Sequence, residues 1–209
     1  MSGPSDPELT AMITGHRRQL TDLLAALPAS AWDQPSLCAG WRVREVAAHI
    51  LMTLRTPAWR FAAEMARSGG NFSRMADRVA RRDGAAAPAE LVAALREHED
   101  TIFQPPGGGV GAGLTHDVIH GLDMTAALGV EHPVPEPTLR AVLDTVNGTQ
   151  SRKHFGVNLD GIRLQADDID WSCGSGQVVS GSAQDLALVA CGRRLPAGRL
   201  QGGASARFA

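Results

Sequence analysis

Apolar residues recur at intervals of three and four through most of this chain, which is the spacing of one face of an α-helix. The pattern predicts helices over about 7–27, 43–55, 88–103, 114–128 and 138–155. Pro57 should kink or end the second helix, with a continuation through Trp59 and Met65. The arginine-rich stretch 68–87 is expected to be a solvated polar segment, and 104–113 a loop. Short striped helices joined by loops favour a helix bundle.

The pattern changes after Gly156, where apolar and polar residues alternate. This period of two predicts strands over 162–166, 169–172 and 177–180. A helix over 182–191 follows, opened by Ser182 with Asp185 three residues on, close to a capping box. The fold class is therefore mainly α. We expect an antiparallel four-helix bundle over about 7–130 and a further helix, together residues 1–155, then a small C-terminal α+β domain over 156–209.

Composition narrows the class of protein. Of the 209 residues, 44% are hydrophobic and 20% are charged, with a formal net charge of −2. That balance gives no electrostatic signature for nucleic acid or an anionic membrane. No apolar run reaches membrane-spanning length, and the first residues lack the basic and apolar regions of a signal peptide, so we expect neither a membrane span nor a signal peptide. Its three cysteines are scattered, which indicates free thiols in a reducing cytoplasm. We expect a cytoplasmic monomer or homodimer.

The run HDVIHGLD, residues 116–123, carries the clearest candidate chemistry. On a helix His116 and His120 share a face one turn apart, where two neutral imidazoles can hold one metal ion. Asp123 follows His120 by three residues and could hold that ring's other nitrogen. The alternatives are one packed and one exposed histidine, and an exposed helix carboxylate at Asp123. A third metal ligand has to come from elsewhere.

A second run resembles a known family. Trp32 is followed by PSLCAGWRVREVAAH, residues 35–49, which resembles the signature of mycothiol-dependent maleylpyruvate isomerase-like enzymes. These belong to the DinB-like metal-binding helix-bundle superfamily. The tail resembles the family's small C-terminal domain through Ile169-Asp170-Trp171, Gly181-Ser182-Ala183 and Gly192-Arg193.

The resemblance implies a metal site and a cosubstrate. It places the family's first metal histidine at His49, so that His49, His116 and His120 would hold a divalent metal, Zn²⁺ by preference, with Asp123 behind them. It also implies mycothiol, the low-molecular-weight thiol of actinobacteria, as the group that fills the open metal position. The chain departs from the family pattern, since His116 stands where the isomerase has glutamate and Leu122 stands where the family has tryptophan.

These residues lead to three hypotheses about function. A metal-bound thiol loses its proton at neutral pH, and the thiolate can attack a small electrophile. Three neutral imidazoles keep the site more cationic than a set with a carboxylate, which favours S-transfer. The alternatives are cis–trans isomerisation of the maleylpyruvate type and a non-catalytic protein that binds metal or a small ligand. No catalytic residue is expected beyond the metal site, and Arg78 and Arg82 are candidate contacts for an anionic cosubstrate.

Overall fold

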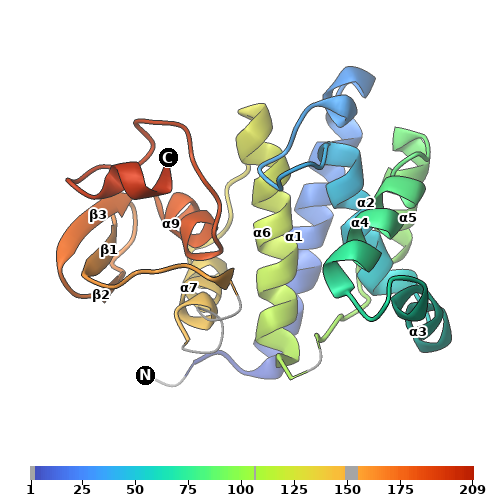
Figure 1. Ribbon diagram of the computed structural model, residues 1–209, viewed down its shortest axis with the longest axis horizontal. Helices are drawn as coiled ribbons and strands as arrows, with labels where there is room; N and C mark the ends of the chain where they lie inside the picture. Colours follow the sequence, from blue (N-terminus) through green and yellow to red (C-terminus); the bar gives the residue numbers. More distant parts are fainter. Residues whose placement is uncertain (1–2, 106, 149–154) are drawn as a thin grey trace.

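The computed structural model describes residues 3–105, 107–148 and 155–209. Helix α6 lies at its centre, between the other helices of the N-terminal bundle and the C-terminal module (Figure 1). The bundle consists of α1 (Asp6–Ala26), α2 (Val43–Arg55), α5 (Pro88–Glu97) and α6 (Gly109–Leu128). The expected mainly α fold with a small sheet is confirmed.

Local sequence explains where the bundle helices begin and end. Ser5 and Glu8 form a reciprocal capping box at the start of α1. Helix α6 ends at Gly129, whose φ of 64° is the left-handed conformation that glycine adopts without strain. Gly121 lets α6 approach α1 closely, because a Cβ there would lie 2.9 Å from His16 Nε2. The close packing of α6 against α1 therefore lies one residue from His120.

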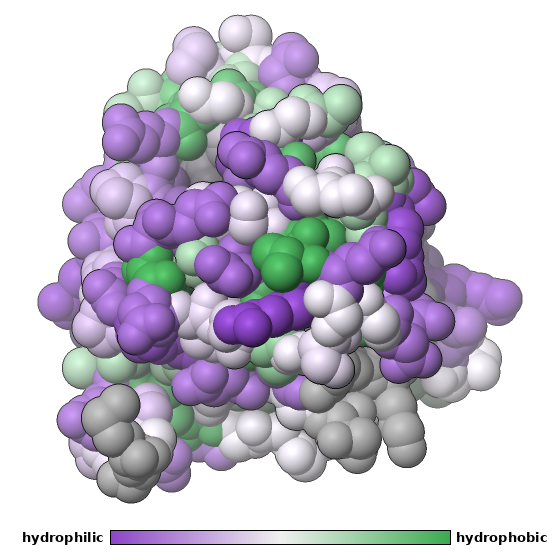
Figure 2. Space-filling view, turned by 90° about the vertical axis from the view of Figure 1, so that its left-hand side faces the viewer, coloured by the Kyte–Doolittle hydropathy of each residue, from purple (hydrophilic) through white to green (hydrophobic). Residues whose placement is uncertain are grey.

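The C-terminal module packs directly on the bundle. Helix α7 (Glu136–Val146) leads toward strands β1 (Ile162–Ala166), β2 (Ser172–Gly174) and β3 (Gln177–Gly181), and then to α9 (Ala183–Ala190). The sheet order is β2-β1-β3, with β2 antiparallel and β3 parallel to β1. One hydrophobic cluster joins α6 and α7 to β1, β3 and α9. The outer face of the module is mostly hydrophilic, with separate hydrophobic spots (Figure 2).

The helix α4 (Phe72–Asp83) corrects the expectation of a solvated polar segment. Its buried residues Met75, Ala76, Val79 and Ala80 recur at helical spacing, and the side chain of Asn71 caps it. The arginines between these positions make the segment look polar in the sequence, so the apolar stripe was not recognised. The continuation after Pro57 is a separate helix, α3 (Ala58–Arg67).

Several boundaries also differ from the predicted ones. Helix α5 ends at Glu97 instead of 103, and α6 begins at Gly109 inside the expected loop. The second strand lies at Ser172–Gly174, later than the predicted 169–172. Part of the helix predicted over 138–155 lies outside the described residues. Among the helices that the structure describes, none has the length and apolar character needed to cross a membrane.

A buried ion pair ties α1 to α6. Arg17, which is 1% exposed, pairs with Asp117, which is 2% exposed. The same guanidinium donates to the carbonyl oxygens of His98, Glu99 and Thr101 at 2.7–3.0 Å. These bonds hold the chain that leaves α5 against α1 and α6.

We expect Arg17→Met to reduce the free energy of unfolding by about 3–5 kcal/mol, because it leaves the Asp117 carboxylate buried without its cation. The matched control is Arg18→Met, whose side chain is 54% exposed and pairs at the surface; it should cost about 0–1 kcal/mol. Urea unfolding followed by circular dichroism measures both. Equal losses for the two variants would contradict the role given to Arg17.

Candidate metal centre

Three histidines from two helices meet at the middle of the bundle. His49 lies on α2, and His116 and His120 lie one turn apart on α6. The ring centroids are 5.1 Å apart for His49–His116, 4.9 Å for His49–His120 and 4.7 Å for His116–His120. One ligand nitrogen from each ring lies within 4.8 Å of the other two. The structure thus brings together the three residues that the sequence nominated.

The spacing of these nitrogens suits one small cation. His49 Nε2 and His116 Nε2 face each other at 3.2 Å. Two nitrogens that each lie about 2.0–2.1 Å from one tetrahedral zinc are about 3.3–3.4 Å apart. A hydrogen bond between the two rings also fits this distance. His120 brings a third nitrogen within 4.8 Å of these two. A hydrogen bond between two rings does not need a third nitrogen, whereas a metal ion does.

A carboxylate supports each of the α6 histidines. His120 Nδ1 lies 3.0 Å from Asp123 Oδ2, the residue nominated from its spacing, and Asp123 is fully buried. His116 Nδ1 lies 3.1 Å from Asp117 Oδ1. A charged carboxylate accepts the Nδ1 proton and leaves Nε2 with its lone pair, the form that binds a metal. Asp117 was missed from sequence, because adjacent helix residues do not face each other.

An arginine in turn holds each carboxylate. Arg193, just after α9, donates from Nε to Asp123 Oδ1 at 2.9 Å and from Nη2 to Asp123 Oδ2 at 2.7 Å. Arg17 on α1 holds Asp117 by donating from both Nε and Nη2 to Asp117 Oδ2. Burial would raise the pKa of Asp123, but the hydrogen bonds from Arg193 and His120 outweigh it and bring the pKa to about 2. Hydrogen bonding to His116 and the charge of Arg17 likewise keep the pKa of Asp117 below its ordinary value despite burial.

Burial favours the neutral form of His49 and His120. It lowers the pKa of His49 well below its ordinary value, and the neighbouring His120 and His116 lower it further. The pKa of His120 is also lowered by burial, although Asp123 opposes that shift. Neutral rings present lone pairs and do not repel a cation, so the electrostatics at His49 and His120 favour a metal ion.

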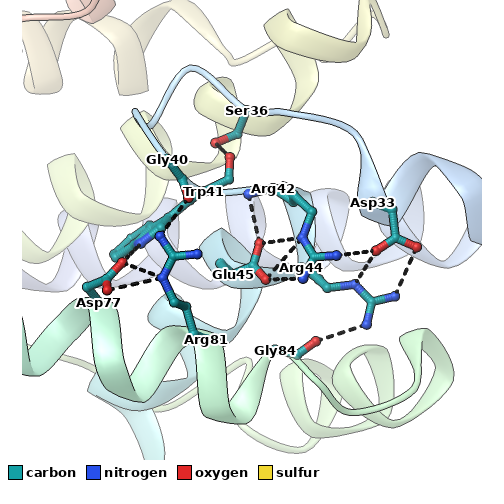
Figure 3. Close-up of polar contacts among 10 residues, drawn as sticks. All are labelled: Asp33, Ser36, Gly40, Trp41, Arg42, Arg44, Glu45, Asp77, Arg81 and Gly84. Carbon is teal, nitrogen blue, oxygen red and sulfur yellow. Dashed lines mark hydrogen bonds and ion pairs between the residues drawn. The ribbon is translucent and has the colours of Figure 1, made fainter.

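The loop before α2 forms one wall of the centre. The indole ring of Trp41 lies 5.0 Å from the ring of His49, and its Nε1 donates to Asp77 on α4 at 2.9 Å (Figure 3). Arg81 holds the same Asp77 and donates to the Gly40 carbonyl oxygen at 3.0 Å (Figure 3). The backbone N–H of Leu37 donates to the Asp123 carbonyl oxygen at 2.9 Å. These bonds fasten the family-like turn to α4 and α6, and Trp41 contacts His49 on α2.

Cys38 lies beside the centre as a protonated thiol. Burial, followed by the charge of Asp123, raises its pKa to about 12. Its Sγ lies 3.7 Å from Arg193 Nη2. Cys38 is therefore a poor nucleophile, which agrees with a structural role in the turn.

Arg78 and Arg82, the candidate anion contacts, lie on α4 around Glu64 of α3. Both guanidinium groups pair with the Glu64 carboxylate, which is 3% exposed. Arg78 Nη2 also lies 3.3 Å from Ser68 Oγ. The described contacts of the two arginines include none of the three histidines, and their role toward a cosubstrate stays a prediction.

Comparisons with known proteins bear on this arrangement. Residues 14–102 match the profile of the mycothiol maleylpyruvate isomerase N-terminal domain. Two crystal structures of the mycothiol-dependent maleylpyruvate isomerase, one of them a histidine-to-alanine mutant, share the fold with TM-scores of 0.66 and 0.67. Their sequence identity to this chain is 14% and 15%, over 98% of this chain and 97% of theirs.

The curated relatives extend over most of the chain. Two uncharacterised proteins of Mycobacterium tuberculosis, from strains CDC 1551 / Oshkosh and ATCC 25618 / H37Rv, are each 30% identical to it. Each match covers 84% of this chain and 81% of the relative. The matching profile includes the turn and helix that carry His49. The resemblance read from the sequence is thus confirmed, and the chain belongs to the mycothiol-dependent maleylpyruvate isomerase-like family.

Proposed function

We propose that this chain is a metal-dependent enzyme that uses a low-molecular-weight thiol, mycothiol, to act on a small electrophile. The observation that carries the proposal is the convergence of His49, His116 and His120, with a buried carboxylate behind two of the rings. Three protein nitrogens leave a tetrahedral metal one open position, which is typical of catalytic sites. When bound, the metal would favour the thiolate form of the cosubstrate's sulfur.

The surrounding residues keep the ligands oriented and place aromatic rings beside them. Asp117 and Asp123 hold the Nδ1 protons of His116 and His120, so both rings keep one tautomer and one orientation. Trp41 covers His49, and the ring of Phe103 lies 5.4 Å from that of His116. Apolar rings beside the ligands lower the local dielectric, which strengthens electrostatic effects there.

Two reactions share the first step. The thiolate sulfur donates an electron pair to an electrophilic carbon and a C–S bond forms. In S-transfer that bond remains and a leaving group departs with its electrons. In isomerisation of a cis-alkene conjugated to a carbonyl group, the π electrons move onto the carbonyl oxygen as the C–S bond forms. The resulting carbon–carbon single bond rotates, and the electrons then return to form the trans double bond as the C–S bond breaks, which regenerates the thiolate. The solved relatives are named for isomerisation, whereas the three neutral imidazoles of this chain favour transfer.

Metal content tests the ligand set. We expect purified protein to bind one equivalent of Zn²⁺ and His49→Ala to lose most of it, because two nitrogens from α6 alone leave the site incomplete. Elemental analysis after dialysis measures the bound metal. His98→Ala, a histidine outside the cluster, is the control. Full metal content in His49→Ala would remove His49 from the site.

Metal affinity tests the supporting carboxylate. We expect Asp123→Asn to weaken Zn²⁺ binding about 10–100-fold, since the neutral amide holds the His120 ring less firmly. Competition with a chromophoric chelator gives the affinity. Asp144→Asn, which changes an exposed carboxylate that contacts Trp171, should leave affinity unchanged. Thermal unfolding checks that each variant is folded, and unchanged affinity in a folded Asp123→Asn would contradict the role.

Activity tests the chemistry. Metal-loaded protein should conjugate mycothiol to monochlorobimane or convert maleylpyruvate to its trans isomer, and the two assays run side by side separate transfer from isomerisation. A chelator should abolish the activity and added Zn²⁺ should restore it. His120→Ala should lose at least about 100-fold while remaining folded, since the bundle has its own core. Turnover no faster than the uncatalysed reactions with mycothiol, bacillithiol and glutathione would favour a non-catalytic binding protein.

A further inference from the structure

A cavity lies on the side of α6 that faces the C-terminal module. It has a volume of about 460 Å³ and is formed where the end of α6, the connection over 129–134 and the start of α9 meet. None of the three clustered histidines lines it. Its volume falls in the range of small-molecule sites, about 300–1,000 Å³.

Two buried polar atoms at this cavity have no partner among the described residues. His132 is 5% exposed, and its Nε2 makes no hydrogen bond. The Oε1 of Gln184 is also buried and unpartnered, although Gln184 Nε2 donates to the His132 carbonyl oxygen at 3.3 Å. Burial lowers the pKa of His132 and favours its neutral ring, in which Nε2 offers a lone pair when the proton is on Nδ1. Unmet buried polar groups destabilise a fold, and a ligand with N–H donors would satisfy both.

The charged side chains at the cavity favour a ligand with a positive charge. Glu131, Asp168 and Asp185 contribute three negative charges and Arg199 one positive charge, a net charge of −2. Arg199 is engaged by Asp185 at 2.6 Å, whereas Glu131 and Asp168 have no ion pair among the described residues.

The start of α9 offers little to an anion. The backbone N–H of Ala183 donates to Asp168 Oδ1 at 2.8 Å, and that of Asp185 donates to Ser182 Oγ at 3.2 Å. These donors are already in use, and an anion placed there would meet the Asp168 and Glu131 carboxylates. The cavity therefore favours a cation.

We propose that this cavity binds a small organic cation, a primary ammonium group on a short aliphatic chain. The ammonium group has three N–H donors. The acceptors that the cavity offers to these donors are Gln184 Oε1, His132 Nε2 and the Asp168 carboxylate. The aliphatic chain lies against Leu122, Leu139 and Leu188, which also line the cavity.

Three probes of equal length and different charge test the proposal: n-butylammonium, 1-butanol and butyrate. The full chain is titrated with each at constant ionic strength, and the imidazole ring resonances of His132 are followed by NMR. We expect saturable shifts with n-butylammonium, at least tenfold weaker binding of 1-butanol and no binding of butyrate. Equal binding of the three probes, or none by n-butylammonium, would overturn the proposal.

Two substitutions should move the affinity in opposite directions. Gln184→Glu adds a carboxylate beside His132 and should tighten n-butylammonium binding several-fold. Asp168→Asn keeps an oxygen to accept from Ala183 but removes a charge, and should weaken binding several-fold. Asp160→Asn, an exposed carboxylate outside the cavity, is the matched control. If folded Gln184→Glu and Asp168→Asn both bind n-butylammonium as the unaltered chain does, the cavity is not the site.

Discussion

The buried pair between Arg17 and Asp117 is the interaction on which the arrangement of this protein depends. Two charges removed from water stabilise a fold only when each finds further partners. Arg17 uses its remaining donors on three carbonyl oxygens after α5, and Asp117 uses its other oxygen on His116. The same contact therefore joins three helices of the bundle and sets the ring of a candidate metal ligand. The Asp117 carboxylate thus contributes both to the stability of the bundle and to the orientation of His116.

A second pair repeats the arrangement from the other side of the molecule. Arg193, which follows α9, holds Asp123, and Asp123 holds His120. The C-terminal module thus supplies a cation that the bundle lacks, and its packing against α6 fixes where that cation lies. Because the Asp123 backbone also accepts from Leu37, the turn before α2 is bound to the same point. The bundle histidines accordingly depend on the module for their orientation.

Whether the sequence could predict an interaction depends on how far apart its two residues lie along the chain. The pairing of His116 with His120, and of His120 with Asp123, is local, and helical spacing alone nominates it. His49 came from the family resemblance, since nothing in its helix marks it as a ligand. Arg17 and Arg193 reach their partners across 100 and 70 residues, so no local pattern shows them. Helix α4 was missed because its narrow apolar stripe lies among arginines, and β2 shifted because Ile169 and Trp171 pack in a turn rather than a ladder.

The charge balance of the centre connects the fold to its chemistry. Imidazole binds a metal in its neutral form, and each carboxylate behind the rings is matched by one arginine, Asp117 by Arg17 and Asp123 by Arg193. The protein therefore contributes no net charge at the site, and the charge of a bound divalent ion would remain uncompensated. A carboxylate ligand in place of His116 would reduce that charge by one. The chain accordingly provides a site in which an anionic ligand such as a thiolate gains the most from binding, because the surroundings are buried and their effective dielectric is low.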